Sequence, residues 1–101
     1  MENRVDNLLQ SVKEILIEAC KPEQIILFGS RAKGKAETGS DFDFAVKTNH
    51  KPVKNEFFAM KSRIEKISGL YKVDIVFLSD LDEEFKQIIL ETGKVIYEKG
   101  S

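Results

Sequence analysis

The spacing of the apolar residues changes several times along this chain, and these changes limit the folds that it can adopt. Apolar residues follow helical spacing over about residues 3–20, 53–68 and 81–92. Residues 25–28, 41–47 and 72–78 instead form short apolar runs or alternating patterns that are typical of strands. The sequence therefore predicts the order helix, strand, loop, strand, helix, strand, helix, and residues 95–97 are expected to form only a short extended tail.

This order predicts the α/β (α+β) class, with a short mixed three-stranded sheet flanked by about four helices if the loop of residues 30–40 contains one helical turn. That loop allows the first two strands to pair antiparallel, and the long helix before the third strand favours a parallel crossover. Gly69 is expected to end the middle helix, while Asp80 and Glu83 resemble a capping box for the last one. A chain of 101 residues is expected to form a single domain over residues 1–101.

Composition excludes several classes of function. The net charge of −1 argues against strong nucleic-acid binding by the chain itself and against binding to an anionic membrane. No apolar run approaches the roughly 18 residues that a membrane-spanning helix needs. The single cysteine, Cys20, allows no internal disulfide and favours the reducing cytoplasm. A homo-oligomer is compatible with the sequence.

Two acidic residues begin the second predicted strand, where acidic residues are normally rare. Asp41 and Asp43 would share one face while Phe42 points into the core. Their mutual repulsion would be relieved by a divalent cation, and hard carboxylate oxygens suit Mg²⁺ or Mn²⁺. The alternative is a solvated strand end with no ligand.

Asp74 is a third carboxylate, in the strongly apolar third strand. If that strand lies beside the second, Asp74 can share a face with Asp41 and Asp43. Three such carboxylates could hold two metal ions about 4 Å apart, the arrangement that supports in-line phosphoryl transfer. The alternative for Asp74 is a salt bridge with Lys72 or another surface cation.

A glycine and a serine directly follow the first predicted strand. Gly29 would allow a phosphate to approach the backbone closely, and backbone N–H groups with the Ser30 hydroxyl could donate to its oxygens. Arg31 is the best nearby candidate for bidentate phosphate binding. Alone, Gly-Ser is more often a turn, and Lys33 is as easily explained by a solvated basic loop. The only histidine, His50, lies in a polar segment and is expected at the surface.

The spaced pattern is more specific than its parts. Gly29-Ser30, then Asp41-x-Asp43, then Asp74 on a later strand resembles the polymerase-beta-like nucleotidyltransferase superfamily. The runs 29–34, 39–46 and 93–98 look like the minimal nucleotidyltransferases, called MNT. The resemblance covers essentially the whole chain and implies a palm-like nucleotidyltransferase fold.

The resemblance also implies functional roles. Gly29 and Ser30, with Arg31, would bind the triphosphate, whereas Asp41, Asp43 and Asp74 would form the catalytic metal site for two Mg²⁺ ions. MNT proteins are often paired with a HEPN-domain protein, commonly an RNase toxin. The implied function is therefore transfer of AMP from ATP to a hydroxyl of that toxin, specifically that of a tyrosine, so that the chain would act as an antitoxin.

Two other functions remain open at this stage. One is nucleotide transfer to a small molecule, as in the related aminoglycoside nucleotidyltransferases, although those carry an additional domain for which 101 residues are expected to leave no room. The other is a binding module that neutralises its partner by contact alone.

Overall fold

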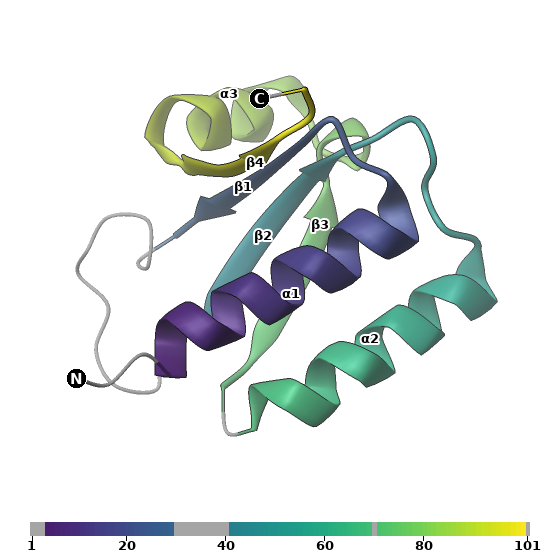
Figure 1. Cartoon of the computed structure of the whole chain (residues 1–101). Coiled ribbons are helices and arrows are strands. Elements are labelled where there is room, and N and C mark those ends of the chain that lie inside the picture. The colour runs from purple at the N-terminus through teal and green to yellow at the C-terminus, as the bar shows by residue number, and fades with distance from the viewer. Residues whose placement is uncertain (1–3, 30–40, 70, 101) are drawn as a thin grey trace.

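The computed structural model of the chain describes residues 4–29, 41–69 and 71–100. In these ranges a four-stranded sheet is sandwiched between helices (Figure 1). The elements are α1 (Arg4–Cys20), β1 (Gln24–Phe28), β2 (Phe42–Lys47), α2 (Lys54–Ser68), β3 (Val73–Phe77), a 3-10 turn (Leu78–Asp80), α3 (Glu83–Thr92) and β4 (Lys94–Glu98).

The sheet has the strand order β3-β2-β1-β4. β1 pairs antiparallel with both β2 and β4, and β2 pairs parallel with β3 across the crossover made by α2. The prediction of a mixed sheet, with an antiparallel first pair and a parallel second pair, is confirmed. The predicted helices and strands also begin and end within one or two residues of their observed bounds.

Two details of the prediction are wrong within the described residues, and one element was not predicted. The expected tail at 95–97 is part of a fourth strand, because its backbone hydrogen-bonds to the free edge of β1. The described ranges contain the three α-helices that helical spacing predicts, and also a 3-10 turn that was not predicted. Asp82, and not Asp80, caps α3, since its carboxylate accepts a 2.8 Å hydrogen bond from the Phe85 N–H while Asp80 closes the 3-10 turn. The helical turn predicted within 30–40 falls outside the described residues.

The sheet has a large core on one face and a small one on the other. α1 and α2 cover the first face (Figure 1), where Phe42, Phe44 and Val46 of β2 are fully buried. α3 covers the second face, where Ala45 of β2 lies in a small buried cluster with Ile26, Leu78 and Ile89. β2 therefore presents large side chains to one side and small or acidic ones to the other, as its alternating sequence predicts. None of the described helices is long and apolar enough to cross a membrane.

Candidate active site

The central feature of the second face is a pair of carboxylates on neighbouring parallel strands. Asp43 of β2 and Asp74 of β3 are direct register partners, so their side chains lie on the same face of the sheet. The two carboxyl groups are close enough for the negative charge of Asp74 to raise the pKa of Asp43. The expected meeting of these two residues is confirmed, and it follows from alternation within each strand together with the parallel crossover.

Gly29 closes the site from the other side, because it follows β1 at the point where Phe28 pairs with Asp43. Its φ of 80° lies in the left-handed region that favours glycine. A Cβ at this position would come within 2.7 Å of the Asp43 Oδ2 atom. The backbone and the carboxylate are thus in direct apposition, and no larger residue fits without moving one of them.

The electrostatics of Asp43 reflect this crowding. Its pKa is raised above the usual range, first by burial and then by the negative charges of Asp74 and Asp41, while Lys72 partly offsets the effect. The ion pairs formed among the described residues include neither Lys72 nor Asp74, so the alternative of a simple salt bridge for Asp74 is not observed. A carboxylate held in this way gains from a bound divalent cation, which would offset the repulsion.

Asp41 completes the predicted acidic set, but its position differs from that of the other two. It is exposed and directly precedes β2, close enough to act electrostatically on Asp43. Among the described residues, no three acidic, histidine or cysteine side chains converge closely enough to hold a metal ion as they stand. Ser30, Arg31 and Lys33 fall outside the described ranges, so their predicted roles at the phosphate are untested.

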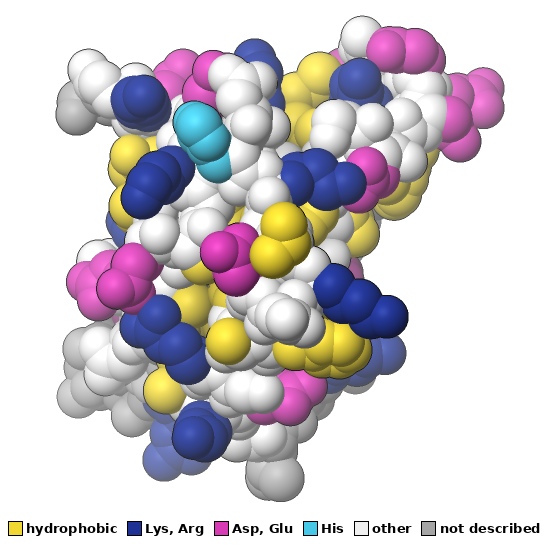
Figure 2. Space-filling model, turned by 90° about the vertical axis from the view of Figure 1, so that its right-hand side faces the viewer, with side chains coloured by type: hydrophobic (Ala, Val, Ile, Leu, Met, Phe, Trp, Pro, Cys, Tyr) yellow, Lys and Arg dark blue, Asp and Glu magenta, His cyan; other side chains and the backbone are white. Residues whose placement is uncertain are grey.

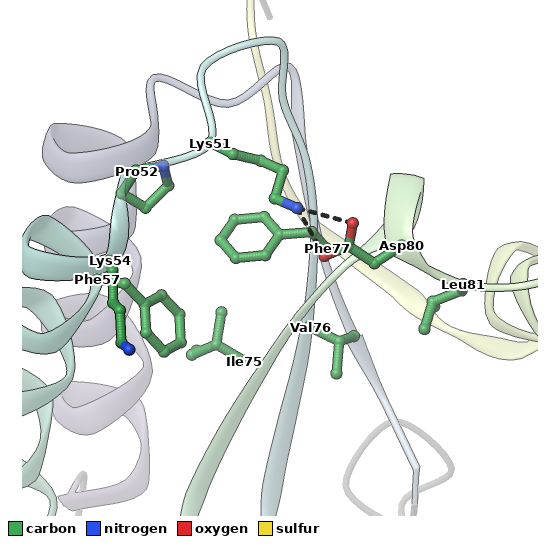
Figure 3. A pocket seen from close by; sticks show the side chains of 9 residues that line it. All are labelled: Lys51, Pro52, Lys54, Phe57, Ile75, Val76, Phe77, Asp80 and Leu81. Atoms are coloured by element: carbon green, nitrogen blue, oxygen red, sulfur yellow. Dashed lines mark hydrogen bonds and ion pairs between the residues drawn. The ribbon is translucent and has the colours of Figure 1, made fainter.

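A separate apolar pocket lies at the free edge of β3. It encloses about 430 Å³, and Figure 3 shows Phe57 of α2 facing Ile75 and Phe77 of β3 across it. The Lys51 ammonium spans its rim, 2.7 and 2.8 Å from the two carboxylate oxygens of Asp80 and 5.4 Å from the centre of the Phe77 ring. The three candidate catalytic carboxylates are not part of its lining.

Two aromatic residues beside the site were missed by the sequence analysis. The Phe28 and Phe85 rings form an edge-to-face pair with centroids 6.0 Å apart, which joins α3 to the strand end beside Asp43. The signal available was the aromatic residue directly before Gly29. His50 lies exposed at the surface, as predicted, among charged side chains of both signs on the face shown in Figure 2.

Two carboxylates on neighbouring strands, with a glycine turn against them, are compatible with phosphoryl transfer assisted by metal ions. The family profile described as "Polymerase beta, Nucleotidyltransferase" matches residues 10–101. The chain belongs to this family and is a nucleotidyltransferase, a class of enzymes that generally uses divalent metal ions.

Curated relatives carry a more specific name. The chain is 33% identical over 94 residues to the "Probable protein adenylyltransferase MntA" of Haemophilus influenzae, covering 90% of this chain and 80% of the relative. It is 29% identical over 93 residues to the "Protein adenylyltransferase MntA" of Thermococcus cleftensis, covering 92% of this chain and 91% of that protein.

Solved structures share the fold. A crystal structure of a toxin–antitoxin with AMP-PNP superposes with a TM-score of 0.75 and 22% identity, covering 90% of this chain and 73% of that one. A complex of a tri-AMPylated Shewanella oneidensis HEPN toxin with an MNT antitoxin gives a TM-score of 0.70 and 19% identity, covering 93% and 72%. At these identities the similarity is one of fold.

Proposed function

We propose that this chain transfers AMP from ATP to a hydroxyl group, specifically that of a tyrosine, on a HEPN-type partner toxin, and so acts as an antitoxin. The observation that carries the proposal is the direct apposition of Asp43, Asp74 and the Gly29 backbone at one strand end. The naming of the two curated relatives as protein adenylyltransferases supports a protein as the acceptor. The toxin–antitoxin complexes among the structures of the same fold support a HEPN-type partner.

Asp41, Asp43 and Asp74 would hold the metal. Their oxygen atoms are the ligands that Mg²⁺ and Mn²⁺ prefer. Burial and the negative charges of Asp74 and Asp41 raise the pKa of Asp43, and Lys72 only partly offsets this effect, so a bound cation would stabilise the ionised carboxylate. Two ions bound here would neutralise charge on the triphosphate and lower the pKa of the attacking hydroxyl. Because Asp41 is exposed at the lead-in to β2, it is able to turn towards the ions without disturbing the core.

The segment after β1 would hold the nucleotide. Gly29 has no side chain to separate the phosphates from the backbone, and its close approach to Asp43 would keep phosphate and carboxylates within reach of shared ions. We assign Ser30 as a hydroxyl donor to the outer phosphates and Arg31 as their bidentate cation.

The chemical step follows from these positions. The acceptor oxygen attacks the α-phosphorus in line and forms a new P–O bond. At the same time the bond between the α-phosphorus and the oxygen that bridges to the β-phosphate breaks, and pyrophosphate leaves. Asp74 accepts the proton of the acceptor hydroxyl, whose unperturbed pKa is about 10 for tyrosine. The adenylyl group adds negative charge and bulk to the partner, which opposes binding of RNA phosphates there.

Co-expression with the HEPN-domain partner, followed by intact-mass measurement, tests the proposal. The partner is expected to gain whole AMP units with the wild-type chain and none with Asp43→Asn or Asp74→Asn. Asp6→Asn is the matched control, since it removes one exposed carboxylate in the first turn of α1. If both site variants protect cells as well as the wild type without adding mass, neutralisation is by contact and the chain is a binding module.

A further inference from the structure

Helix α3 buries little of its apolar surface. Only Ile89 is fully buried, whereas Phe85, Ile88 and Leu90 are 40%, 51% and 46% exposed. Successive helical residues are about 100° apart, so Ile88 and Leu90 lie on opposite flanks of the buried Ile89 line. Phe85 is three residues before Ile88 and therefore shares its flank. We call Phe85 and Ile88 the α3 flank.

Acidic side chains border the α3 flank. Glu84 and Glu91 are four residues before and three residues after Ile88, which places an apolar side chain between two carboxylates on one stripe of the helix. Neither glutamate forms an ion pair with any other part of the chain that the structure describes. By contrast, Glu83 on the other side is 3.3 Å from the Lys86 ammonium.

The α3 flank is continuous with the candidate active site. The Phe85 ring packs edge-to-face on Phe28, and Phe28 pairs with Asp43 across β1 and β2. A protein seated on this flank would therefore extend over the carboxylates, where an acceptor hydroxyl has to arrive.

We propose that the α3 flank docks the acceptor protein, and that the acceptor presents an apolar centre between basic side chains there. The inference rests on the proposed function and names the surface through which it works. A second copy of the chain fits less well, because a two-fold interface would bring the Glu84 and Glu91 stripe against its own like charges. An acceptor with lysine or arginine beside an apolar side chain complements the stripe in both sign and spacing.

Two variants on one helix test this choice of surface. Ile88→Glu places a charge at the centre of the α3 flank, and Leu90→Glu makes the same change at similar exposure on the opposite flank. With the purified HEPN-domain partner in calorimetry, Ile88→Glu is expected to weaken association at least about tenfold, as at a central interface contact. Leu90→Glu should stay within about twofold. Thermal melting checks that both variants are folded.

A charge-reversal variant gives an independent readout. Glu84→Lys with Glu91→Lys should weaken association severalfold at low salt and make it less dependent on salt, because complementary charges are lost. Equal association by the wild type, Ile88→Glu and the charge-reversed variant would overturn the inference, as would a loss seen only with Leu90→Glu.

Measuring AMP transfer alongside association separates this inference from the proposed function. If Ile88→Glu modifies a limiting amount of partner as fast as the wild type, the docking surface is elsewhere while the enzymatic proposal stands. If Ile88→Glu loses association but even the wild type transfers no AMP, the surface is correct and the proposed reaction is not.

Discussion

Replacing Gly29 with alanine should destabilise the protein through two separable effects. A φ of 80° costs a residue with a Cβ about 1–2 kcal/mol relative to glycine. The new Cβ would also lie 2.7 Å from Asp43 Oδ2, an overlap of the kind that costs about 1–3 kcal/mol when a packed site is overfilled. We therefore expect Gly29→Ala to lower the free energy of unfolding by about 2–5 kcal/mol.

A double-mutant cycle distinguishes the two effects. Asp43→Ala removes the oxygen that the new Cβ would meet, so in this background Gly29→Ala should cost only the backbone strain. Asp43→Asn keeps an atom in the same place and should leave nearly the full cost. The assay is urea unfolding of all the single and double variants without metal or nucleotide. If Gly29→Ala costs the same amount in all three backgrounds, the contact with Asp43 does not explain the glycine, and the apposition described here is wrong.

Three further predictions follow from the site and the core. Asp43→Asn should raise the melting temperature of the metal-free protein, because burial and the charges of Asp74 and Asp41 hold the pKa of Asp43 high and make its ionised form costly at neutral pH. The same variant should lose the stabilisation by Mg²⁺ and ATP, about 2.7 kcal/mol at a hundred times Kd, and an unfolded variant would instead show a structural role. Ser30→Ala should weaken ATP binding by about 1.5–3 kcal/mol and leave AMP binding nearly unchanged in calorimetry, whereas equal losses would remove Ser30 from the outer phosphates. Burial raises the pKa of the Cys20 thiol from 9.0 to about 11. The contribution of Cys20 to the free energy of unfolding should therefore be present below about pH 9 and lost as pH rises towards 11. If Cys20→Ala shows the same decline with pH as the wild type when unfolding is measured, this prediction is wrong.

The part of the fold that alternation and helical spacing determine could be predicted from the sequence. Asp43 and Asp74 were expected on one face for two reasons. In each strand the acidic residue alternates with apolar residues that point to the other face, and the helix between the two strands favours a parallel crossover. Residues 25–28 could be predicted as a buried strand because they form a short apolar run directly before a glycine.

What the sequence did not predict depends on contacts between distant segments. Residues 95–97 are too few to show a pattern, and they form a strand because the edge of β1 is available to pair with them. Asp80 and Asp82 both precede glutamates, so local sequence did not distinguish the residue that caps α3 from the one in the 3-10 turn. The contact between Gly29 and Asp43 requires the register of β1 on β2, which no local pattern contains.

The parallel pairing of β2 with β3 has a consequence for how the site forms during folding. In the sequence, Asp43 precedes α2 and Asp74 follows it. The two residues therefore meet only after α2 has packed and the chain has returned to the sheet as β3. In a partly folded chain in which only β1 and β2 have paired, Asp43 would be in place but Asp74 would not. Cation affinity at this pair should therefore appear late in folding and in a single step. In amide exchange experiments, added metal should slow the global opening of the central strands far more than the fraying of β4.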